Sequence, residues 1–307
     1  MLKKIFVISM LSIFVSSFCV IGLTKASEST GLIISPPIIE KTLEKSAKVT
    51  DKIKLTNASD NDLKITVIKK DFKANPNSED GAASLVEPEK NNTFVLSSWV
   101  NVTDTFTLKS KEVKEVAYTI TAPADAEPGG HYGSILFTPS LVNPTALNGS
   151  GTIIASEIGA LILVNVPGAI NYGAKIASFE TAKKIYINST NLVEFFTRFQ
   201  NLSTVHVKPV GTIVVTNLLG KNSTSLVVNE NAGNVLPDSI RKFTNSWEKK
   251  YGFGFYKATL SLTYDGNKNI SSTFIFWIIP WKETLAIVVI LILLSLFLSK
   301  LQWKNKQ

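Results

Sequence analysis

The sequence YKATLSLTYD, residues 256–265, alternates apolar and polar side chains over its whole length. Every second residue from Tyr256 to Tyr264 is apolar, and each residue between them is Lys, Thr or Ser. A period of two residues places the two kinds of side chain on opposite faces of a β-strand. The stretch therefore predicts a strand with one face buried in a core and the other in solvent.

The same alternation recurs along the body of the chain. Residues 53–55, 63–67 and 116–120 each place Ile, Leu, Val or Tyr on one face and Lys, Thr or Ala on the other. Short strands of this kind, separated by turns rich in Asn, Asp and Gly, are typical of antiparallel sandwiches. We predict an all-β protein of two tandem immunoglobulin-like β-sandwich domains, followed by one C-terminal transmembrane helix.

Two pairs of short segments suggest that the domains are copies of one another. The stretch LTNAS at 55–59, followed by Leu63, is similar to FQNLS at 199–203, followed by Val207. Each is interpreted as a strand, an Asn-x-Ser turn and a second strand, and Asn57 and Asn201 are therefore not taken as glycosylation acceptors. Chance similarity between two β segments is the alternative. The polar residues 73–92 are interpreted as a long loop that only the first copy has.

A second match places a tyrosine at the same position in both copies. GHYGSIL at 130–136 is similar to GFYKATL at 254–260, so that Tyr132 corresponds to Tyr256. The boundary between the domains is placed at the Val-Pro-Gly-Ala sequence of residues 166–169. The strand before it, 159–166, is apolar on both faces, which predicts a place at the centre of a sandwich or at the contact between the domains.

Two apolar segments with lysines beside them indicate export and membrane attachment. Lys3 and Lys4 precede the apolar residues 5–23, and the small residues before position 27 suit cleavage after Ala26, with an uncleaved anchor as the alternative. Residues 285–298 carry no charge and are apolar all round, which favours a membrane span over a core helix. The three lysines of the final residues favour a cytoplasmic tail. We predict a single-pass protein of the cell membrane, with its body outside the cytoplasm and its helix in contact with lipid. The predicted segments are a signal peptide 1–26, domains 27–167 and 168–280, a helix 282–300 and a tail 301–307.

The formal net charge of +8 does not indicate a nucleic-acid partner. Three basic residues lie in residues 1–26, and four basic residues and one acidic residue lie in residues 282–307. The body between them keeps 25 basic and 23 acidic residues, a net charge of +2. Nucleic-acid binding needs a basic face or stripe, so this class of partner is set aside.

The sequence contains no recognisable catalytic or metal-binding pattern. The single cysteine lies before Ala26, the two histidines lie in different copies, and no Gly-x-Ser-x-Gly turn is present. The carboxylates Glu79 and Asp80 are interpreted as solvated loop residues. We expect a protein that is not an enzyme and that needs no cofactor and no metal.

Three residues of the first domain are candidates for binding a glycan. Sugar faces stack on aromatic rings while polar groups bind the hydroxyls, which directs attention to Trp99, His131 and Tyr132. A purely structural role is the alternative for all three. It is favoured for Tyr132, because Tyr132 corresponds to Tyr256 in the predicted core strand.

The order of these features resembles bacterial cell-wall surface proteins of the WxL-interacting type. The similarity lies in PPII at 36–39, the turn at Asn57, the Ala-Pro at 122–123, PGGHY at 128–132, LPDSIRKF at 236–243, and the helix with its basic tail. The resemblance implies two immunoglobulin-like domains, the first associated with peptidoglycan and the second with a partner. No ligand residue of that family is carried over to this chain.

The sequence leaves three functions open. The leading hypothesis is a membrane-anchored surface protein that binds either peptidoglycan or another surface protein through its immunoglobulin-like domains. The alternatives are a scaffold subunit of a membrane assembly, such as a secretion, pilus or transport complex, and a periplasmic-type chaperone that completes a client's sheet through an exposed strand edge.

Overall fold

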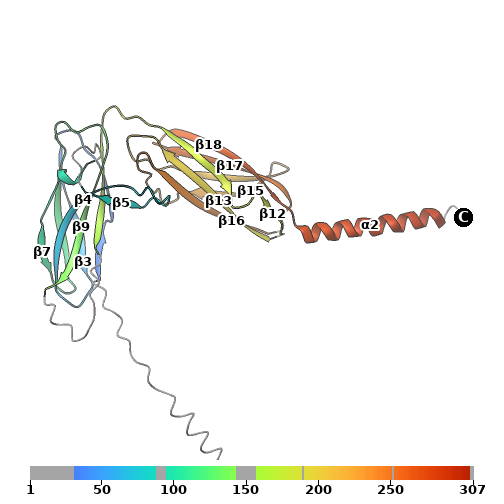
Figure 1. Cartoon of the computed structure of the whole chain (residues 1–307), viewed down its shortest axis with the longest axis horizontal. Helices are drawn as coiled ribbons and strands as arrows, with labels where there is room; N and C mark the ends of the chain where they lie inside the picture. The colour runs from blue at the N-terminus through green and yellow to red at the C-terminus, as the bar shows by residue number, and fades with distance from the viewer. Residues whose placement is uncertain (1–30, 88–94, 143–156, 189, 251, 305–307) are drawn as a thin grey trace, which may run out of the picture.

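The structure is a computed structural model that describes residues 31–87, 95–142, 157–188, 190–250 and 252–304. Within these residues the strands form four sheets, which pair as two sandwiches, and a helix follows them (Figure 1). The predicted fold class is confirmed. The predicted signal peptide lies outside the described residues.

The first sandwich is formed by the strands up to Val166. One sheet has the order β1-β3-β8-β6, and the other has the order β2-β10-β9-β4-β5, with β7 also paired to β4. The chain passes from one sheet to the other between β1 and β2, where the Ser35–Pro36 peptide bond is cis. The strands are β1 (Leu32–Ser35), β2 (Ile38–Thr42), β3 (Lys48–Asn57), β4 (Leu63–Ala74), β5 (Ala83–Val86), β6 (Val100–Val102), β7 (Thr105–Leu108), β8 (Val113–Thr121), β9 (Gly129–Leu141) and β10 (Ile158–Val166), with a 3-10 turn η1 (Ser97–Trp99).

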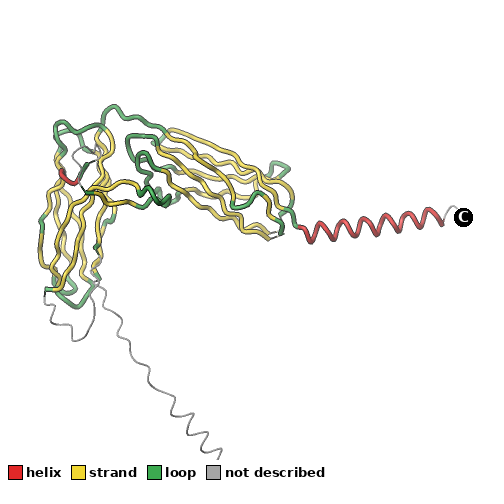
Figure 2. The backbone as a smooth tube through the Cα atoms, in the orientation of Figure 1, coloured by secondary structure: helices red, strands yellow, loops and turns green. Residues whose placement is uncertain are grey.

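The second sandwich repeats this plan with fewer strands. One sheet has the order β11-β13-β16, and the other has the order β12-β18-β17-β14-β15. Figure 2 shows the two strand-rich bodies joined by loops, with the helix leaving the far end of the second. The strands are β11 (Ala174–Thr181), β12 (Ile185–Tyr186), β13 (Thr190–Asn201), β14 (Val210–Asn217), β15 (Asn222–Val228), β16 (Ile240–Lys250), β17 (Gly254–Tyr264) and β18 (Lys268–Ile278).

The alternating stretches form the cores as predicted. Ile53 and Leu55 of β3 and Ile120 of β8 are fully buried in the first sandwich. In β17 the five apolar positions from Tyr256 to Tyr264 are all buried in the second. Burial of a Leu, Ile or Phe side chain contributes about 1.5–3 kcal/mol, so these faces are what hold the two sheets of each sandwich together.

Strand β10 combines the two positions that its sequence leaves open, the centre of a sandwich and the contact between the domains. Ile162 and Val164 face the core of the first sandwich and are fully buried there. Leu163 points to the opposite face and packs between the two sandwiches. Apolar side chains on both faces are therefore needed over residues 160–164, whereas Asn165 near the end of the strand is only partly buried.

The Asn-x-Ser turns are confirmed as equivalent structures. Asn57 and Asn201 are both fully buried, and each amide nitrogen donates to the carbonyl oxygen four residues later, at 2.8 Å in both cases. Each side-chain oxygen accepts the backbone N–H two residues later, from Ser59 at 3.0 Å and from Ser203 at 2.8 Å. The two copies differ beyond the turn, because β14 begins at Val210 and Val207 forms only an isolated bridge with Val235.

Two sequence interpretations need correction. Residues 73–92 are not one long loop, because β4 extends to Ala74 and β5 pairs with it from Ala83 to Val86. Tyr132 and Tyr256 are both buried, but they lie on different faces of equivalent strands: Tyr256 faces the core of its own sandwich, whereas Tyr132 faces away from the core. A shift of one residue in a strand exchanges the two faces, and a short sequence match cannot detect it.

The terminal helix α2 (Trp281–Lys304) begins three residues after β18 ends. Its segment Trp281–Ser299 is long and apolar enough to cross a membrane, and the described part of the chain leaves this segment uncovered. A core helix, the alternative considered from the sequence, is not what the structure shows. The helix also continues to Lys304, into the residues predicted as a tail.

Candidate functional site: the cleft between the sandwiches

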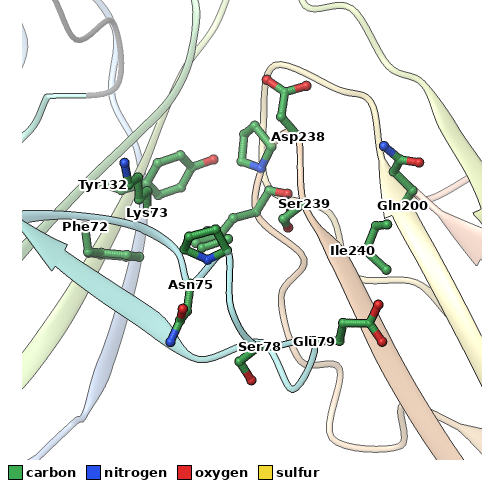
Figure 3. A pocket seen from close by; sticks show the side chains of 14 residues that line it. Phe72, Lys73, Asn75, Ser78, Glu79, Tyr132, Gln200, Asp238, Ser239 and Ile240 are labelled. Atoms are coloured by element: carbon green, nitrogen blue, oxygen red, sulfur yellow. Dashed lines mark hydrogen bonds between the residues drawn. The ribbon is translucent and has the colours of Figure 1, made fainter.

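A cleft of about 650 Å³ lies where the two sandwiches meet. Figure 3 shows Phe72, Lys73 and Tyr132 of the first sandwich on one side and Gln200 and Ile240 of the second on the other. The lining combines amides, hydroxyls and charges with apolar groups. Its residues are Phe72, Lys73, Ala74, Asn75, Pro76, Ser78, Glu79, Tyr132, Gln200, Leu236, Pro237, Asp238, Ser239 and Ile240.

The hairpin of β4 and β5 supplies one wall of the cleft. It extends from the first sandwich toward the second (Figure 1), and its turn is closed by the Asn75 N–H, which donates to the Ala82 carbonyl at 3.0 Å. Gly81 in this turn has a φ of +86°, and a Cβ there would lie 2.5 Å from Nε of Arg241. Glycine is needed at this position because it tolerates the left-handed backbone and leaves room for the guanidinium of the second sandwich.

The opposite wall is the turn that leads into β16. Ser239 holds this turn by donating its hydroxyl to the Leu236 carbonyl at 2.7 Å, while the Ser239 carbonyl accepts the N–H of Asn201 at 3.0 Å. Asp238 has a φ of 53°, a conformation that Asp tolerates better than most residues. The buried Asn201 turn therefore fixes the position of this wall.

Ion pairs between the sandwiches flank the cleft. Glu79 of the hairpin pairs with Nε of Arg198 at 2.7 Å, and Glu40 of β2 pairs with Lys208 at 2.6 Å. The hydrogen bond that Arg198 donates to Glu79 raises the pKa of Arg198. Burial opposes ionisation of Glu40, but bonds from Lys208 and Asn234 outweigh it and lower its pKa. These pairs are partly exposed, so each contributes at most about 1 kcal/mol.

A buried group of side chains lies at the base of the cleft. Phe72, Tyr132 and Leu163 of the first sandwich pack against Leu236 of the second, and we call these four residues the interdomain cluster. The Tyr132 hydroxyl also shares a hydrogen bond of 3.3 Å with Nδ1 of His206. Each residue of the cluster is at most 9% exposed, so its apolar contacts stabilise the interface more than the ion pairs do.

Burial also determines the charge states in this contact. It raises the pKa of Tyr132, which therefore stays a neutral phenol. It lowers the pKa of His206, and nearby Lys208 lowers it further while Glu40 opposes the shift. A neutral imidazole is thus favoured at the contact.

The structure separates the three predicted ligand residues. Trp99 and His131 lie together, with ring centroids 4.3 Å apart, whereas Tyr132 lies on the opposite face of β9 and lines the cleft. His131 is 3% exposed, and its ring nitrogens lie 3.2 Å from the Val95 carbonyl oxygen and 2.9 Å from that of Glu127. In this arrangement the imidazole contacts protein groups rather than solvent, and it covers part of the indole.

Sequence reasoning missed most of the cleft. The sequence predicts a solvated loop residue at Glu79, but Glu79 binds Arg198, which is 119 residues further along the chain. No local pattern marks such a pair. The Asn201 turn, which positions the second wall, could be predicted from the sequence, because residues 199–203 are similar to residues 55–59 around Asn57.

The described residues contain no group of three or more His, Cys, Asp or Glu side chains that could hold a metal ion. A second, smaller cavity of about 480 Å³ lies beside the same domain contact. It is lined by Glu40, Asn165, Tyr172, Val205, His206, Val207, Lys208, Asp265 and Gly266.

Comparison with known proteins finds chains of similar structure but no relative by sequence. No family model and no curated protein matches the chain. Among solved structures, the class 5 fimbriae chaperone CfaA is 15% identical with a TM-score of 0.40, covering 79% of this chain and 98% of its own. The E. coli chaperone DraB is 12% identical with a TM-score of 0.38 (80% and 98%), and the Pseudomonas aeruginosa chaperone CupB2 is 10% identical with a TM-score of 0.37 (78% and 98%). Similarity at this level concerns the fold alone, and the resemblance to WxL-interacting proteins stays a prediction.

Proposed function

We propose that this chain is a non-enzymatic, membrane-anchored protein that binds an extended segment of a partner protein in the cleft between its two sandwiches. The observation that carries the proposal is that both sandwiches contribute to one cleft whose lining mixes hydrogen-bonding and apolar groups. Binding sites for other molecules are commonly concave surfaces of this kind, often between domains. Ligand binding would then depend on how the two sandwiches are held together.

A protein segment fits the cleft better than a cell-wall polymer does. Sugar rings stack on exposed aromatic faces, but Phe72 and Tyr132 are only 3% and 2% exposed. The β4–β5 hairpin instead offers an extended backbone, since no strand within the described residues pairs with the second edge of β5. An extended peptide can add to such an edge and place its side chains in a neighbouring pocket.

Membrane anchoring through α2 completes the proposal. The helix leaves the second sandwich at the end opposite the cleft (Figure 2), so the cleft would be held on the outer side of the membrane, one sandwich length away from the bilayer. The resemblance to WxL-interacting proteins, which assigns peptidoglycan to the first domain and a partner to the second, is compatible with this arrangement. Peptidoglycan binding is therefore an explicit outcome of the test.

Photo-crosslinking in intact cells tests the proposal on the full-length chain. A crosslinking amino acid is placed at Lys73 and at Gln200, one on each wall, with Lys64 and Lys221 as controls on the same two sandwiches but away from the cleft. Lys64 lies nine residues before Lys73 in β4, about 30 Å away. We expect both cleft positions to capture the same segment of one protein and the controls to capture none.

Adducts that a wall-degrading glycosidase removes would show binding of a polymer instead, and no adduct at either cleft position would refute the cleft as a binding site. A steric block gives an independent check. Ser78→Trp should fill the cleft and abolish the adducts, whereas Ser225→Trp, at an exposed position of β15, should leave them unchanged. The captured segment, made as a peptide, should then bind the reconstituted protein and lose affinity only for the Ser78 variant.

A further inference from the structure

The outward face of β18 changes character along the strand. Its exposed side chains are Asn269, Ser271 and Thr273 in the first half and Ile275 and Trp277 in the second. Ile275 is 55% exposed and Trp277 is 46% exposed. The strand therefore becomes apolar on its solvent side only where it approaches α2.

Neighbouring strands extend this apolar surface. Ile185 of β12 lies opposite Trp277 in parallel register and is 52% exposed, and Ile187 follows it with 59% exposed. Phe255 of β17 lies opposite Trp277 on the other side, with the two rings 5.7 Å apart. Residues directly opposite one another share a face of the sheet, so these side chains form one surface. We call Ile185, Ile187, Phe255, Ile275 and Trp277 the apolar end of the sheet.

The apolar end is directly continuous with the helix. Trp281, the first residue of α2, is 48% exposed, and Ile279 donates its N–H to the Tyr186 carbonyl at 2.7 Å. The helix therefore starts from the edge where β12 and β18 end, without a flexible linker. Trp281 lies four residues after Trp277 in the sequence, so the apolar end begins within about 13 Å of the helix.

Membrane dimensions place this surface at the lipid boundary. The 19 residues Trp281–Ser299 span about 28 Å as a helix, close to the hydrocarbon thickness of about 30 Å. Trp281 would then lie at the interface, where Trp and Tyr are enriched. The headgroup layers add about 5–7 Å on each side, so a modest lean of the second sandwich brings the apolar end into them.

The charges around the apolar end are also those expected near a bilayer. Lys183, Lys184, Lys257 and Lys282 are all exposed beside it, with Glu283 as an opposing acid in the first turn of α2. Lys257 lies opposite Ile275 in the sheet. Lysines close to an anionic membrane surface contribute about 1 kcal/mol each, which favours lipid over a neutral protein partner as the occupant of this surface.

We propose that the apolar end lies in the interfacial layer of the bilayer and thereby fixes the tilt of the second sandwich on the membrane. The inference rests on the proposed function in one respect, namely that α2 spans the membrane. Partial burial of five large apolar side chains would add to the anchoring that the helix provides. It would also orient the cleft toward partners at a defined angle.

Site-directed labelling of the full chain in vesicles tests the inference. A fluorophore is attached to a single cysteine in a Cys19→Ser background, and its quenching by lipids brominated near the headgroup is measured. Ile275→Cys should lose emission, and Ser271→Cys, four residues earlier on the same face, should not. Val227→Cys, a 54% exposed apolar position on β15, controls for the affinity of the label itself for lipid and should stay unquenched.

Ile290→Cys in the middle of α2 separates the two proposals. If deeply brominated lipids quench the label at position 290 but headgroup-brominated lipids do not quench the label at position 275, the lipid contact of the apolar end is refuted and the membrane anchor is retained. Absence of quenching at position 290 would refute the membrane anchor itself. Native fluorescence gives a label-free check: with Trp281→Phe and Trp303→Phe in place, brominated lipids should still quench emission, and Trp277→Phe should remove that quenching. Persistence of the quenching without Trp277 would contradict the inference.

Discussion

Asn57 and Asn201 show how one side chain can organise a turn in each sandwich. The Asn201 amide donates to the carbonyls of Val205 and Val235, at 2.8 and 2.9 Å, and its oxygen accepts from Ser203. All of these groups are buried, so no water replaces the asparagine if it is removed. A buried polar group that loses its partner costs about 1–3 kcal/mol.

We therefore predict that Asn201→Ala lowers the free energy of unfolding by about 2–4 kcal/mol, since more than one buried group loses its partner. Urea denaturation of the full chain in detergent measures the change. Asn222→Ala is the matched control, because Asn222 also begins an Asn-x-Ser/Thr triplet but is exposed at the start of β15. Its effect should stay within about 0.5 kcal/mol, and equal effects of the two substitutions would contradict the structural role of Asn201.

His206 makes the contact between the sandwiches dependent on pH. Burial lowers its pKa below the ordinary value of 6.5, so the folded protein binds this proton more weakly than the unfolded chain does. Between the two pKa values the unfolded state carries more protons, and stability therefore rises with pH and falls on acidification below about 6.5. Glu40, Lys208 and Tyr132 are the neighbours that set the size of this effect.

Comparing His206→Gln with the original protein isolates this contribution. In the original chain the urea midpoint should be lower at pH 5.5 than at pH 7.5. The difference between the two midpoints should be smaller in the variant, because glutamine cannot take up a proton at this site. An unchanged pH dependence in His206→Gln would show that other groups cause it.

Tyr132 marks the limit of sequence reasoning at the residue scale. The matching segments correctly identified β9 and β17 as equivalent strands with buried tyrosines. They could not show that Tyr132 points out of its sandwich. Alternation distinguishes the two faces of a strand, but it does not identify which face packs in the core and which packs against the other domain. Only the packing of Phe72 and Leu236 against it reveals the interdomain contact.

At the scale of elements, the strands with one buried face were predictable and the β4–β5 hairpin was not. The hairpin turn at residues 75–82 is polar, while Ala74 and Ala83 on either side of it pack against the interdomain cluster. A short strand such as β5, with Ala, Ser, Leu and Val, has too few residues for its alternation to be recognised.

Gly81→Ala tests how the hairpin is held against the second sandwich. Its φ of +86° disfavours any side chain by about 1–2 kcal/mol, and the new Cβ would also displace Arg241. We expect faster amide hydrogen exchange in the turn at residues 75–82. Gly220→Ala has a similar φ of +73° but nothing within 4 Å, so it should show the backbone strain alone and leave exchange in the hairpin unchanged. Equal exchange in the two variants would argue against docking of the hairpin on Arg241.

At the scale of the whole molecule, the arrangement of the two sandwiches decides whether a cleft exists. The number of sandwiches and the terminal helix follow from alternation and apolar length, and both were predicted. The orientation of the two sandwiches relative to each other depends on contacts between distant residues, such as Leu163 with Leu236 and Glu79 with Arg198. No periodicity encodes such contacts, so the cleft emerges only in the structure.

The two kinds of interdomain contact should differ in importance. Leu236 is 9% exposed, and truncating a buried leucine to alanine costs about 2–5 kcal/mol, whereas a partly exposed ion pair contributes at most about 1 kcal/mol. We therefore predict that Leu236→Ala broadens the distribution of orientations between the sandwiches more than Arg198→Ala does. Spin labels at Lys64→Cys and Lys221→Cys, in a Cys19→Ser background, report the distance between the domains in a pulsed electron paramagnetic resonance experiment. If Arg198→Ala broadens the distribution more, the ion pairs and not the interdomain cluster hold the cleft open, and its shape should then depend on salt concentration.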